Sequence, residues 1–457
     1  MSVSRPGVEA ERERGRASRS TVPRRAHATL AARPADDDPV GRLLEQSARR
    51  LADLAPLRFS RMAVSPFAFL RGADLLMAHD LMASPRTDLV VQLCGDAHLK
   101  NFGLFASPER RLVFDVNDFD ETAPGPFEWD LKRLVASLSI AADLGGLDES
   151  RRTRLVRECV DAYRSSMERF ATMNQLDVWY ASLDVANVFG DLGGFFTDAA
   201  KRSVEDLMGG VRTQSTRSKF DDLIERTRDG PRIRLNPPRM VPLRDLGPLA
   251  DQCRETVDAV LEGYRDSLVS DRRFLLDQFR VVDVARLVVG VGSVGTEGYA
   301  VLLTGRDDDD PFFLQIKEAR GSVLASADDS ASDPGDRVVR GQRLMQATPD
   351  AFLGWYRGRG DRGFYVRQLY DRKASVDVER LGAKQLATYG RVCAWVLARA
   401  HARSGTAAMI AGYLGGGDSF TRALGEFAEA YRVQNLADYR ALVAAVDDGR
   451  VRIVPSA

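Results

Sequence analysis

Hydrophobic and polar positions divide the chain into a helical part, a β part and a second helical part. Apolar side chains recur at helical spacing over 40–85, over 128–280 and from 378 to the end. Between 284 and 369, short runs rich in Val, Leu and Phe predict the strands of a small antiparallel sheet, with one helix at 337–347. Strand-like runs at 88–94 and 112–116 interrupt the first helical part. The pattern therefore predicts an α+β protein.

Residues 1–38 lack this periodicity. The segment is rich in Arg, Ala, Ser and Pro and contains almost no bulky apolar side chain. A segment of this kind buries too little apolar surface to offset the conformational entropy that is lost on ordering. We therefore expect residues 1–38 to form a disordered tail.

Composition and charge exclude several classes of protein. Of 457 residues, 65 are basic and 65 are acidic, so we expect no chain-wide attraction to nucleic acid. The four cysteines are scattered without a CxxC pair, which argues against a disulfide framework or a zinc ribbon and favours a cytoplasmic location. No apolar run approaches 18 residues, so we expect no membrane span.

The first group of chemically informative residues follows the first strand-like run. Asp96, His98 and Asn101 lie close together in the stretch GDAHLKN, and Asp118 and Asp120 follow the next strand-like run. Two such loops at neighbouring strand ends can converge on Mg²⁺, which prefers one or two carboxylates together with substrate phosphate oxygens. Another carboxylate, free of metal, can accept the proton of an attacking hydroxyl. The alternative is a polar turn in which His98 is a packed loop histidine.

The second group is a glycine-rich stretch between two strand-like runs. Gly290, Gly292 and Gly295 form a GxGxxG pattern that contains Ser293, and Lys317 ends the strand-like run FFLQIK. A dinucleotide-binding fold requires a helix after the third glycine, whereas a strand-like run follows here. A glycine-rich loop between two strands can instead bind phosphates through its backbone N–H groups. The alternatives are a glycine-rich hairpin without a ligand and a solvent-facing lysine.

Both groups resemble loops of the protein-kinase-like fold. The pattern GDxHxxN followed by Asp-Phe is similar to the catalytic and metal loops of aminoglycoside phosphotransferases and choline kinases. This resemblance implies that Asp96 is the catalytic base, with His98 in a supporting role. It also implies that Asn101, Asp118 and Asp120 bind Mg²⁺.

The same resemblance assigns the second group to ATP. The strand that ends at Lys317 is similar to the kinase strand whose lysine contacts the nucleotide phosphates. The residues that would cover those phosphates are Gly290, Gly292, Ser293 and Gly295. Asp130, in the segment after the metal loop, would brace the catalytic loop. The alternative is an acidic residue at a helix N-terminus that the helix dipole favours.

The order of these loops is the reverse of that in an ordinary kinase. The catalytic and metal loops precede the glycine loop and the lysine, which predicts a circularly permuted, two-lobed kinase-like fold of the α+β class. In this arrangement residues 39–281 form the large helical lobe and residues 282–377 the small antiparallel β lobe. Residues 378–457 are helices that return to the large lobe.

Most of the chain, from about 40 to 450, also resembles the bacterial domain-of-unknown-function family 2252. The stretches that carry this resemblance are 65–72, 94–105, 115–134, 289–301, 341–346 and 397–405. The name of the family implies no reaction, so this resemblance bears on fold more than on function.

One kinase feature is missing from the chain. Kinases pair the strand lysine with a helix glutamate, whereas the helix predicted at 337–347 has none, and Asp336 or Gln342 would have to substitute. Our main hypothesis is an ATP- and Mg²⁺-dependent phosphotransferase acting on an unidentified small-molecule or protein hydroxyl. A non-catalytic nucleotide-binding pseudokinase and nucleotidyl transfer in the same cleft are alternatives. A two-metal phosphoesterase is disfavoured, because the chain has only four histidines.

Overall fold

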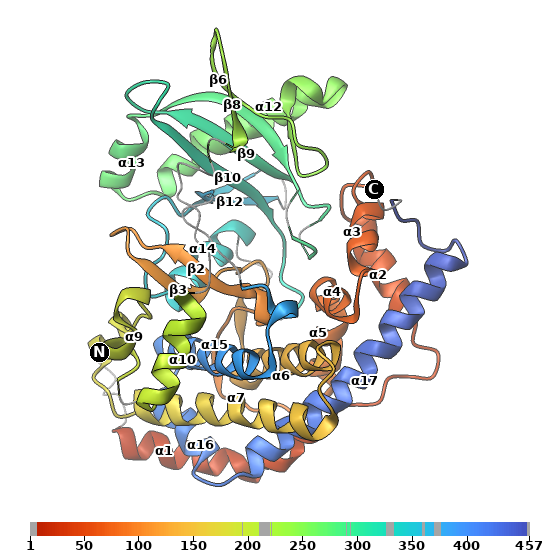
Figure 1. Cartoon of the computed structure of the whole chain (residues 1–457), viewed down its shortest axis with the longest axis vertical. Coiled ribbons are helices and arrows are strands. Elements are labelled where there is room, and N and C mark those ends of the chain that lie inside the picture. Colours follow the sequence, from red (N-terminus) through yellow and green to blue (C-terminus); the bar gives the residue numbers. More distant parts are fainter. Residues whose placement is uncertain are drawn as a thin grey trace.

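The computed structural model describes residues 7–193, 195–209, 220, 222–288, 290–292, 294–325, 333–358, 362–369 and 376–454. Within this part the chain is a mixed α and β protein, which confirms the predicted class (Figure 1). An antiparallel sheet with its own helices lies at the top of the view. A larger group of helices lies below it, and the long helix α17 (Ser419–Asp447) runs along one side.

The other described helices lie in or close to the ranges predicted as helical, except α1. Before the sheet region they are α1 (Val8–Ala17), α2 (Pro39–Ala48), α3 (Ala55–Met62), α4 (Pro66–Gly72), α5 (Asp74–Ala83), α6 (Phe127–Leu144), α7 (Glu149–Phe170), α8 (Gln175–Tyr180), α9 (Val188–Asp191) and α10 (Asp198–Gly209). From there on they are α12 (Ala250–Tyr264), α13 (Ser270–Leu276), α14 (Pro334–Met345), α15 (Ala383–Ser404) and α16 (Ala407–Leu414).

The strands of the main sheet follow the order β11–β12–β10–β9–β8–β7, and every described pair is antiparallel. Their bounds are β7 (Met240–Pro242), β8 (Arg280–Leu287), β9 (Gly298–Thr304), β10 (Pro311–Ala319), β11 (Gly354–Arg357) and β12 (Gly363–Gln368). Outside this sheet, β1 (Val90–Leu93) pairs with β4 (Ala123–Pro126), β2 (Phe102–Ala106) with β3 (Leu112–Val116), and β5 (Ile224–Thr227) with β6 (Gly230–Ile233).

Strand β10 shows how the main sheet is covered on both faces. Side chains alternate between the faces of a strand. Leu314 and Ile316 pack on the face that α12 covers. Phe313 packs on the opposite face, and Lys317 reaches from that face to the helical part of the molecule. The apolar run that predicted this strand therefore also places Lys317 on the face directed at the helical part.

Residues 8–28 are folded, which corrects the prediction of a disordered tail over 1–38. Helix α1 packs closely against α16. A Cβ atom on Gly15 would collide with the carbonyl oxygen of Met409, and one on Gly412 would collide with the carbonyl oxygen of Arg12. The two helices therefore meet backbone to backbone at glycines.

Arginine side chains complete this contact. Arg19 donates to the carbonyl oxygen of Tyr413 (2.8 Å), and Arg24 donates to that of Leu414 (2.6 Å), at the end of α16. His27 is buried, with its Nε2 atom 2.7 Å from the Tyr413 hydroxyl. Close backbone packing and hydrogen bonds thus replace the apolar side chains whose scarcity predicted disorder.

The structure also differs from the lobe boundary predicted near residue 281. Strand β7 joins the main sheet, and α12 covers one of its faces with Val257, Val260 and Tyr264. Residues 224–276 therefore pack with the sheet rather than with the helical lobe predicted for 39–281. A helix needs the same apolar spacing whether it packs on a sheet or on other helices, so the pattern alone did not separate the two cases.

Helix α6 is the central helix of the helical part and is buried along most of its length. It carries charged side chains that are also buried, and most of them have partners. Glu128 accepts hydrogen bonds from the N–H and hydroxyl groups of Thr87. Lys132 differs, because its ammonium group has no hydrogen-bond partner among the described residues and lies 4.4 Å from the centre of the Phe427 ring.

This burial makes Lys132 a source of pH-dependent instability. Burial lowers the pKa of Lys132 from 10.5 to about 8, against the opposing effect of Glu128. When folding lowers the pKa of a lysine, the folded state is most stable at pH values above the pKa in the unfolded state. This stability is lost as the pH falls through the pKa in the folded state. We expect Lys132→Met to raise the free energy of unfolding at pH 7 by up to about 3 kcal/mol. The gain should shrink between pH 8 and 10.5.

Urea denaturation of both proteins at pH 7 and pH 10 tests this expectation. Lys384→Met is the matched control, because Lys384 is exposed on α15 and should change little at either pH. An unchanged or lower stability of Lys132→Met at pH 7 would contradict the prediction.

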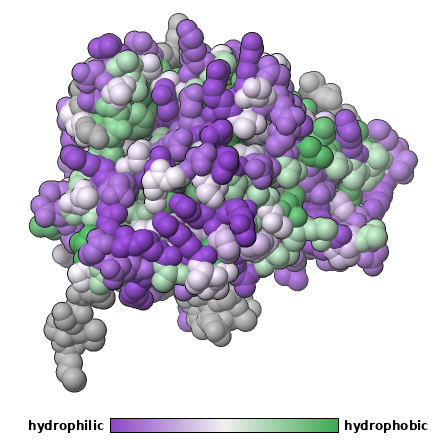
Figure 2. Space-filling model, turned by 90° about the horizontal axis from the view of Figure 1, so that it is seen from below, coloured by the Kyte–Doolittle hydropathy of each residue, from purple (hydrophilic) through white to green (hydrophobic). Residues whose placement is uncertain are grey.

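The molecular surface agrees with the balanced composition. On the face shown in Figure 2, hydrophilic side chains predominate and hydrophobic ones are interspersed among them. No helix in the described ranges combines the length and the apolar composition of a membrane span.

Candidate functional site

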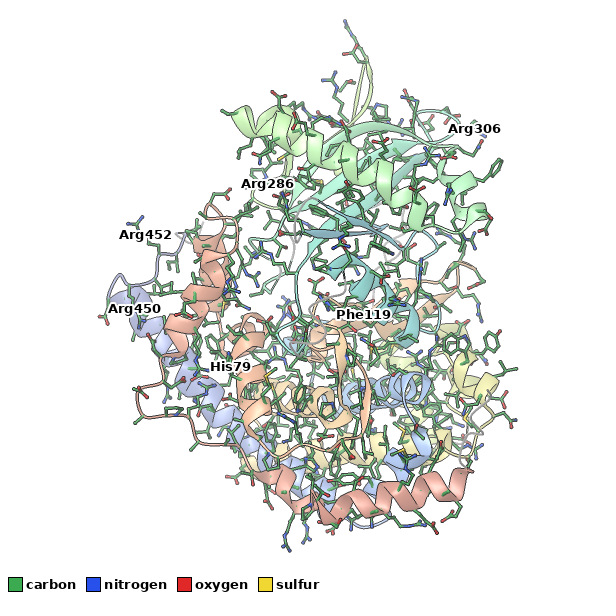
Figure 3. All side chains as sticks on the ribbon, turned by 180° about the vertical axis from the view of Figure 1, so that it is seen from behind. His79, Phe119, Arg286, Arg306, Arg450 and Arg452 are labelled. Atoms are coloured by element: carbon green, nitrogen blue, oxygen red, sulfur yellow. The ribbon has the colours of Figure 1, made fainter. Side chains whose placement is uncertain are left out.

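The two motif loops of the helical part lie side by side because short strands pair beneath them. Strand β1 pairs with β4, and β2 pairs with β3. The loop after β1 and the loop after β3 are therefore brought together. The N–H of Asn117 donates to the carbonyl oxygen of Asn101 (2.8 Å) and links them directly. Phe119, labelled in Figure 3, anchors the second loop between the sheet and the helices and is 1% exposed.

Asp130 at the start of α6 holds the first loop. Its buried carboxylate accepts hydrogen bonds from the N–H groups of Cys94 (2.8 Å) and Gly95 (3.0 Å). Gly95 has a φ of +87°, and a Cβ atom there would collide with the carbonyl oxygen of Glu121. Only glycine fits this conformation and this approach. These contacts agree with the bracing role predicted for Asp130.

Asp96 is oriented by several groups around it. Arg133 of α6 donates to its carboxylate (2.8 Å), and the Nε2 atom of His98 lies 3.4 Å away. The side-chain N–H of Asn101 donates to the Asp96 carbonyl oxygen (2.6 Å). Burial lowers the pKa of His98 well below its usual value, and the charges of Arg71 and Arg133 add to this effect. His98 is therefore a neutral neighbour of the Asp96 carboxylate.

Asp118 has no cation within ion-pair distance among the described residues. The only hydrogen bond to its carboxylate in that part comes from the N–H of Asp120 (3.3 Å). Burial raises the pKa of Asp118 and the Asp120 carboxylate adds to the rise, while Lys317 and Arg367 oppose it. Among the residues predicted to bind metal, the carboxylate of Asp118 and the amide oxygen of Asn101 are thus the oxygen atoms that remain available.

These two side chains do not form a complete protein metal site. Within the described ranges, no group of three or more His, Cys, Asp and Glu side chains is arranged to hold a metal ion. The donor set instead suits Mg²⁺, which commonly binds one or two protein oxygen ligands and completes its shell with substrate oxygens and water.

Lys317 and Asp120 form an ion pair between the sheet and the helical part. The other carboxylate oxygen of Asp120 accepts from the hydroxyl of Tyr365 (2.8 Å), which lies opposite Lys317 on β12. Burial disfavours the charged form of Lys317, but the carboxylates of Asp118 and Asp120 outweigh it and raise the pKa of the lysine. Both carboxylate oxygens of Asp120 are engaged, so in this arrangement Asp120 is bonded to Lys317 and Tyr365 and is not available to a metal.

Helix α14 supplies no acidic partner to Lys317 in the described structure. Asp336 lies 3.5 Å from Arg340 of the same helix, and Gln342 donates to Gln346. The helix instead contacts the metal loop through Arg337, which donates to the carbonyl oxygens of Asp120 and Thr122. The acidic partner of Lys317 is therefore Asp120 of the loop after β3.

The glycine-rich loop is held by the N-terminal helices. Arg50 donates to the carbonyl oxygens of Gly292 and Val294, and Arg61 donates to that of Gly290. The N–H of Leu51 donates to the carbonyl oxygen of Gly295 (2.7 Å). Ser293, predicted to contact phosphate, lies outside the described residues. Arg50 and Leu51 lie between α2 and α3, and Arg61 lies on α3. Because these residues bind carbonyl groups of the loop, they fix it relative to the helical part.

The two groups of motif residues meet at one cavity of about 90 Å³. This volume accommodates several water molecules or a phosphate group. Asp96, His98, Asn101 and Asp118 line it from the helical part, and Gly290 and Gly292 from the glycine loop. The other lining residues are Arg50, Arg71, Asp74, Asp120, Glu121, Val291, Thr296, Glu318, Ala319 and Arg320. Gly295 and Lys317 lie beside the cavity rather than in its wall.

Residues 50–445 match the family DUF2252, described as an uncharacterized protein conserved in bacteria. The chain belongs to this family. Neither a curated protein nor a solved structure matches this chain. The family description names no reaction, so the function of this DUF2252 protein has to be argued from the chemistry of its site.

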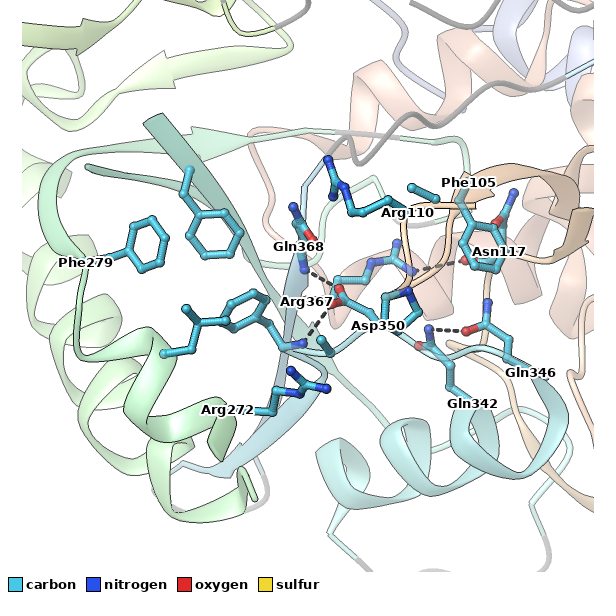
Figure 4. A pocket seen from close by; sticks show the side chains of 16 residues that line it. Phe105, Arg110, Asn117, Arg272, Phe279, Gln342, Gln346, Asp350, Arg367 and Gln368 are labelled. Carbon is cyan, nitrogen blue, oxygen red and sulfur yellow. Dashed lines mark hydrogen bonds between the residues drawn. The ribbon is translucent and has the colours of Figure 1, made fainter. Parts of the chain in front are cut away.

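A second, larger cavity of about 250 Å³ lies on the other side of the metal loop of the DUF2252 protein (Figure 4). Phe279 lies at one end of it, Phe105, Asn117 and Gln346 lie at the other, and Arg367 and Asp350 lie between them. Arg367 donates to the carbonyl oxygen of Asn117 (3.1 Å), next to Asp118. None of the predicted catalytic or metal-binding residues lines this cavity, so the smaller cavity is the candidate active site.

Sequence reasoning missed the arginines around the site. Arg50, Arg71 and Arg320 line the cavity, and Arg133 binds Asp96. Arginine is frequent along the whole chain, so composition does not distinguish these positions. Arg71 lies in the stretch 65–72, one of those that carry the family resemblance, and this was the available signal.

Proposed function

We propose that this DUF2252 protein is an ATP- and Mg²⁺-dependent phosphotransferase that transfers the γ-phosphoryl group of ATP to a hydroxyl acceptor. One observation carries the proposal. Asp96, Asn101 and Asp118 lie far from Gly290 and Gly292 in the sequence, yet all five line the same small polar cavity. The kinase-like resemblance requires this convergence, whereas a polar turn and an unrelated glycine hairpin do not.

The order of the elements also supports a circularly permuted kinase-like fold. The glycine loop lies between β8 and β9, the lysine is on β10, and α14 precedes β11 and β12. This is the small-lobe order that the resemblance implies. On the other side, Tyr389 of α15 donates to the carbonyl oxygens of Leu99 (2.9 Å) and Phe102 (3.0 Å) in the catalytic loop. Helix α15 thus contacts the loop that it would precede in an unpermuted chain.

The site residues have complementary roles in this proposal. Asp118 and Asn101 are the residues that would hold Mg²⁺, which neutralises charge on the phosphate oxygens when bound. Lys317 pairs with Asp120 in the described structure and is placed to exchange that carboxylate for a phosphate oxygen. Gly290 and Gly292 of the glycine loop line the same cavity as Asp96.

Asp96 acts on the acceptor. Its carboxylate, oriented by Arg133, accepts the hydrogen bond of the attacking hydroxyl and takes its proton as the new P–O bond forms. The bond between the γ-phosphorus and the bridging oxygen breaks, and ADP leaves. Positioning and charge neutralisation supply most of the rate enhancement in this reaction class.

A specific observation favours a second candidate, a nucleotide-binding protein without catalysis. No acidic residue of α14 contacts Lys317 in the described structure, and Asp120 is engaged with Lys317 instead. Product analysis separates the remaining possibilities, because phosphoryl transfer releases ADP, nucleotidyl transfer releases pyrophosphate, and a non-catalytic protein releases neither.

Thermal melting with and without Mg²⁺ and ATP tests the proposal. Ligand at 100 times its dissociation constant should stabilise the protein by about 2.7 kcal/mol, which we expect to raise the melting temperature by several degrees. The shift should require Mg²⁺ and should be lost in Asp118→Ala. Asp336→Ala is the matched control and should keep the shift, because Asp336 does not line the cavity. No shift of the unmodified protein with any nucleotide would reject the proposal.

A further inference from the structure

We propose that Arg71 binds a phosphate group inside the candidate active-site cavity, beside Asp96 and Asp118. The phosphate is either the γ-phosphate of the nucleotide or a phosphate carried by the acceptor. The inference rests on the proposed function and makes it more specific, because it adds an anion-binding residue from outside the kinase-like elements.

Arg71 is the cavity arginine that has no partner. It lies near the end of α4, and no hydrogen bond or ion pair joins its side chain to any other described residue. Its Nε atom is buried and has no hydrogen-bond partner in the described part. By contrast, Arg50 binds carbonyl oxygens of the glycine loop, and Arg320 binds Glu318 (3.2 Å). A buried polar group without a partner is costly, which indicates a partner that arrives from outside the chain.

The position of Arg71 fits a ligand between the two loops. Its backbone oxygen lies close to Gly292, and its side chain lines the cavity together with Asp96 and Asp118. Burial lowers the pKa of Arg71, while the carboxylates of Asp96, Glu379 and Asp118 favour its charged form. Arg71 is half-buried, and its guanidinium group lies within electrostatic range of Asp96 and Asp118.

The charge pairing around the cavity favours a phosphate bound together with a metal ion. The carboxylate of Asp96 is paired with Arg133, that of Asp120 with Lys317, and that of Glu318 with Arg320. Three other ionic groups in this wall lack an ion pair among the described residues, but each has a hydrogen-bond partner: Arg50 binds carbonyl oxygens of the glycine loop, Asp74 accepts from Gln46 (3.4 Å), and Glu121 accepts from the N–H of Val323 (2.7 Å). The carboxylate of Asp118 accepts only from the N–H of Asp120 (3.3 Å), and the guanidinium of Arg71 has no partner in the described part. Asp118 and Arg71 therefore match the metal and the anion of a metal–phosphate pair. Arginine binds phosphate oxygens through a planar pair of N–H groups.

Binding measurements on Arg71→Gln test the proposal, with Mg²⁺-ATP, Mg²⁺-ADP and inorganic phosphate as probes. If Arg71 binds the γ-phosphate, Mg²⁺-ATP binding should weaken about tenfold or more, while Mg²⁺-ADP binding stays unchanged. If Arg71 binds an acceptor phosphate, both nucleotides should bind as before. In that case, binding of inorganic phosphate to the protein saturated with Mg²⁺-ADP should be lost.

Two further variants keep the test decisive. Arg320→Gln removes a cavity arginine that is already paired, so it should weaken binding less than Arg71→Gln does. Arg71→Lys retains the charge without the planar fork and should fall between Arg71→Gln and the unmodified protein. It also replaces Arg71→Gln if that variant does not fold.

The outcomes also separate this inference from the proposed function. Unchanged binding of ATP, ADP and phosphate by the Arg71 variants would overturn the role of Arg71 and leave the phosphotransferase proposal intact. If the unmodified protein binds phosphate with Mg²⁺ but binds no nucleotide, the phosphotransferase proposal fails. Loss of that phosphate binding in Arg71→Gln would then still support the anion site.

Discussion

Replacement of Asp96 by Asn is expected to lower the rate of ADP formation by a factor of roughly 10²–10⁴, the contribution typical of a general base. Asn keeps the shape of the side chain and can still accept a hydrogen bond, but it cannot take a proton. Because Asp118 and Asn101 are unchanged, the Mg²⁺-dependent thermal shift with ATP should remain. The measurement is the rate at which ADP appears with Mg²⁺ and ATP, alongside melting of the same sample.

Asp88→Asn is the matched control for this substitution. Asp88 is exposed just before β1, so its loss should leave the rate unchanged. Equal rates for Asp96→Asn and the unmodified protein would contradict the role of Asp96. If the unmodified protein binds Mg²⁺-ATP but forms neither ADP nor pyrophosphate, the non-catalytic alternative is correct.

Replacement of Asp130 by Ala is expected to lower the free energy of unfolding by about 3–5 kcal/mol. The buried carboxylate accepts from the N–H groups of Cys94 and Gly95, and the Nε2 atom of His401 lies 3.3 Å away. Alanine leaves all three groups without this partner in the interior. The free energy follows from urea denaturation at pH 7, and this prediction does not depend on the proposed function.

Asp143→Ala provides the comparison on the same helix. Asp143 is partly exposed and pairs with Arg152 (3.0 Å) and Arg432 (3.3 Å), so its loss should cost about 1 kcal/mol or less. Asp130→Asn should be intermediate, because its amide oxygen can accept from one N–H while its NH₂ group faces the other. Equal losses of unfolding free energy in Asp130→Ala and Asp143→Ala would show that the hydrogen bonds of Asp130 stabilise the protein no more than the ion pairs of Asp143 do.

Strong local periodicity predicted the main elements close to where they lie. The run FFLQIK falls within β10, and the helix predicted at 337–347 corresponds to α14 at Pro334–Met345. Two of the strands that the pattern missed are short and carry turn-forming residues. Strand β4 has the sequence APGP, and β6 has GPRI. Such segments have little intrinsic strand preference and are extended because a neighbouring strand pairs with them.

The folded N-terminal segment illustrates the same limit. Scarcity of apolar side chains predicts disorder only if burial of apolar surface is the source of stability. In this protein, glycines let α1 approach α16, and arginines bind the carbonyl oxygens at the end of α16. Neither contact leaves a periodic pattern, because each depends on a partner that is distant in the sequence.

Spacing along the chain was enough to identify Asp96, Asn101 and Asp118 as candidates, and the glycine pattern with Lys317 as a second group, because each group lies within a short stretch. Their pairing could not be found in this way. Arg133, Asp120 and Arg71 acquire their roles from the geometry of the fold: Arg133 binds Asp96, Asp120 binds Lys317, and Arg71 is left without a partner in the cavity wall. Local motifs specify chemical groups, whereas ion pairing in a buried site depends on distances between segments that only the folded chain brings together.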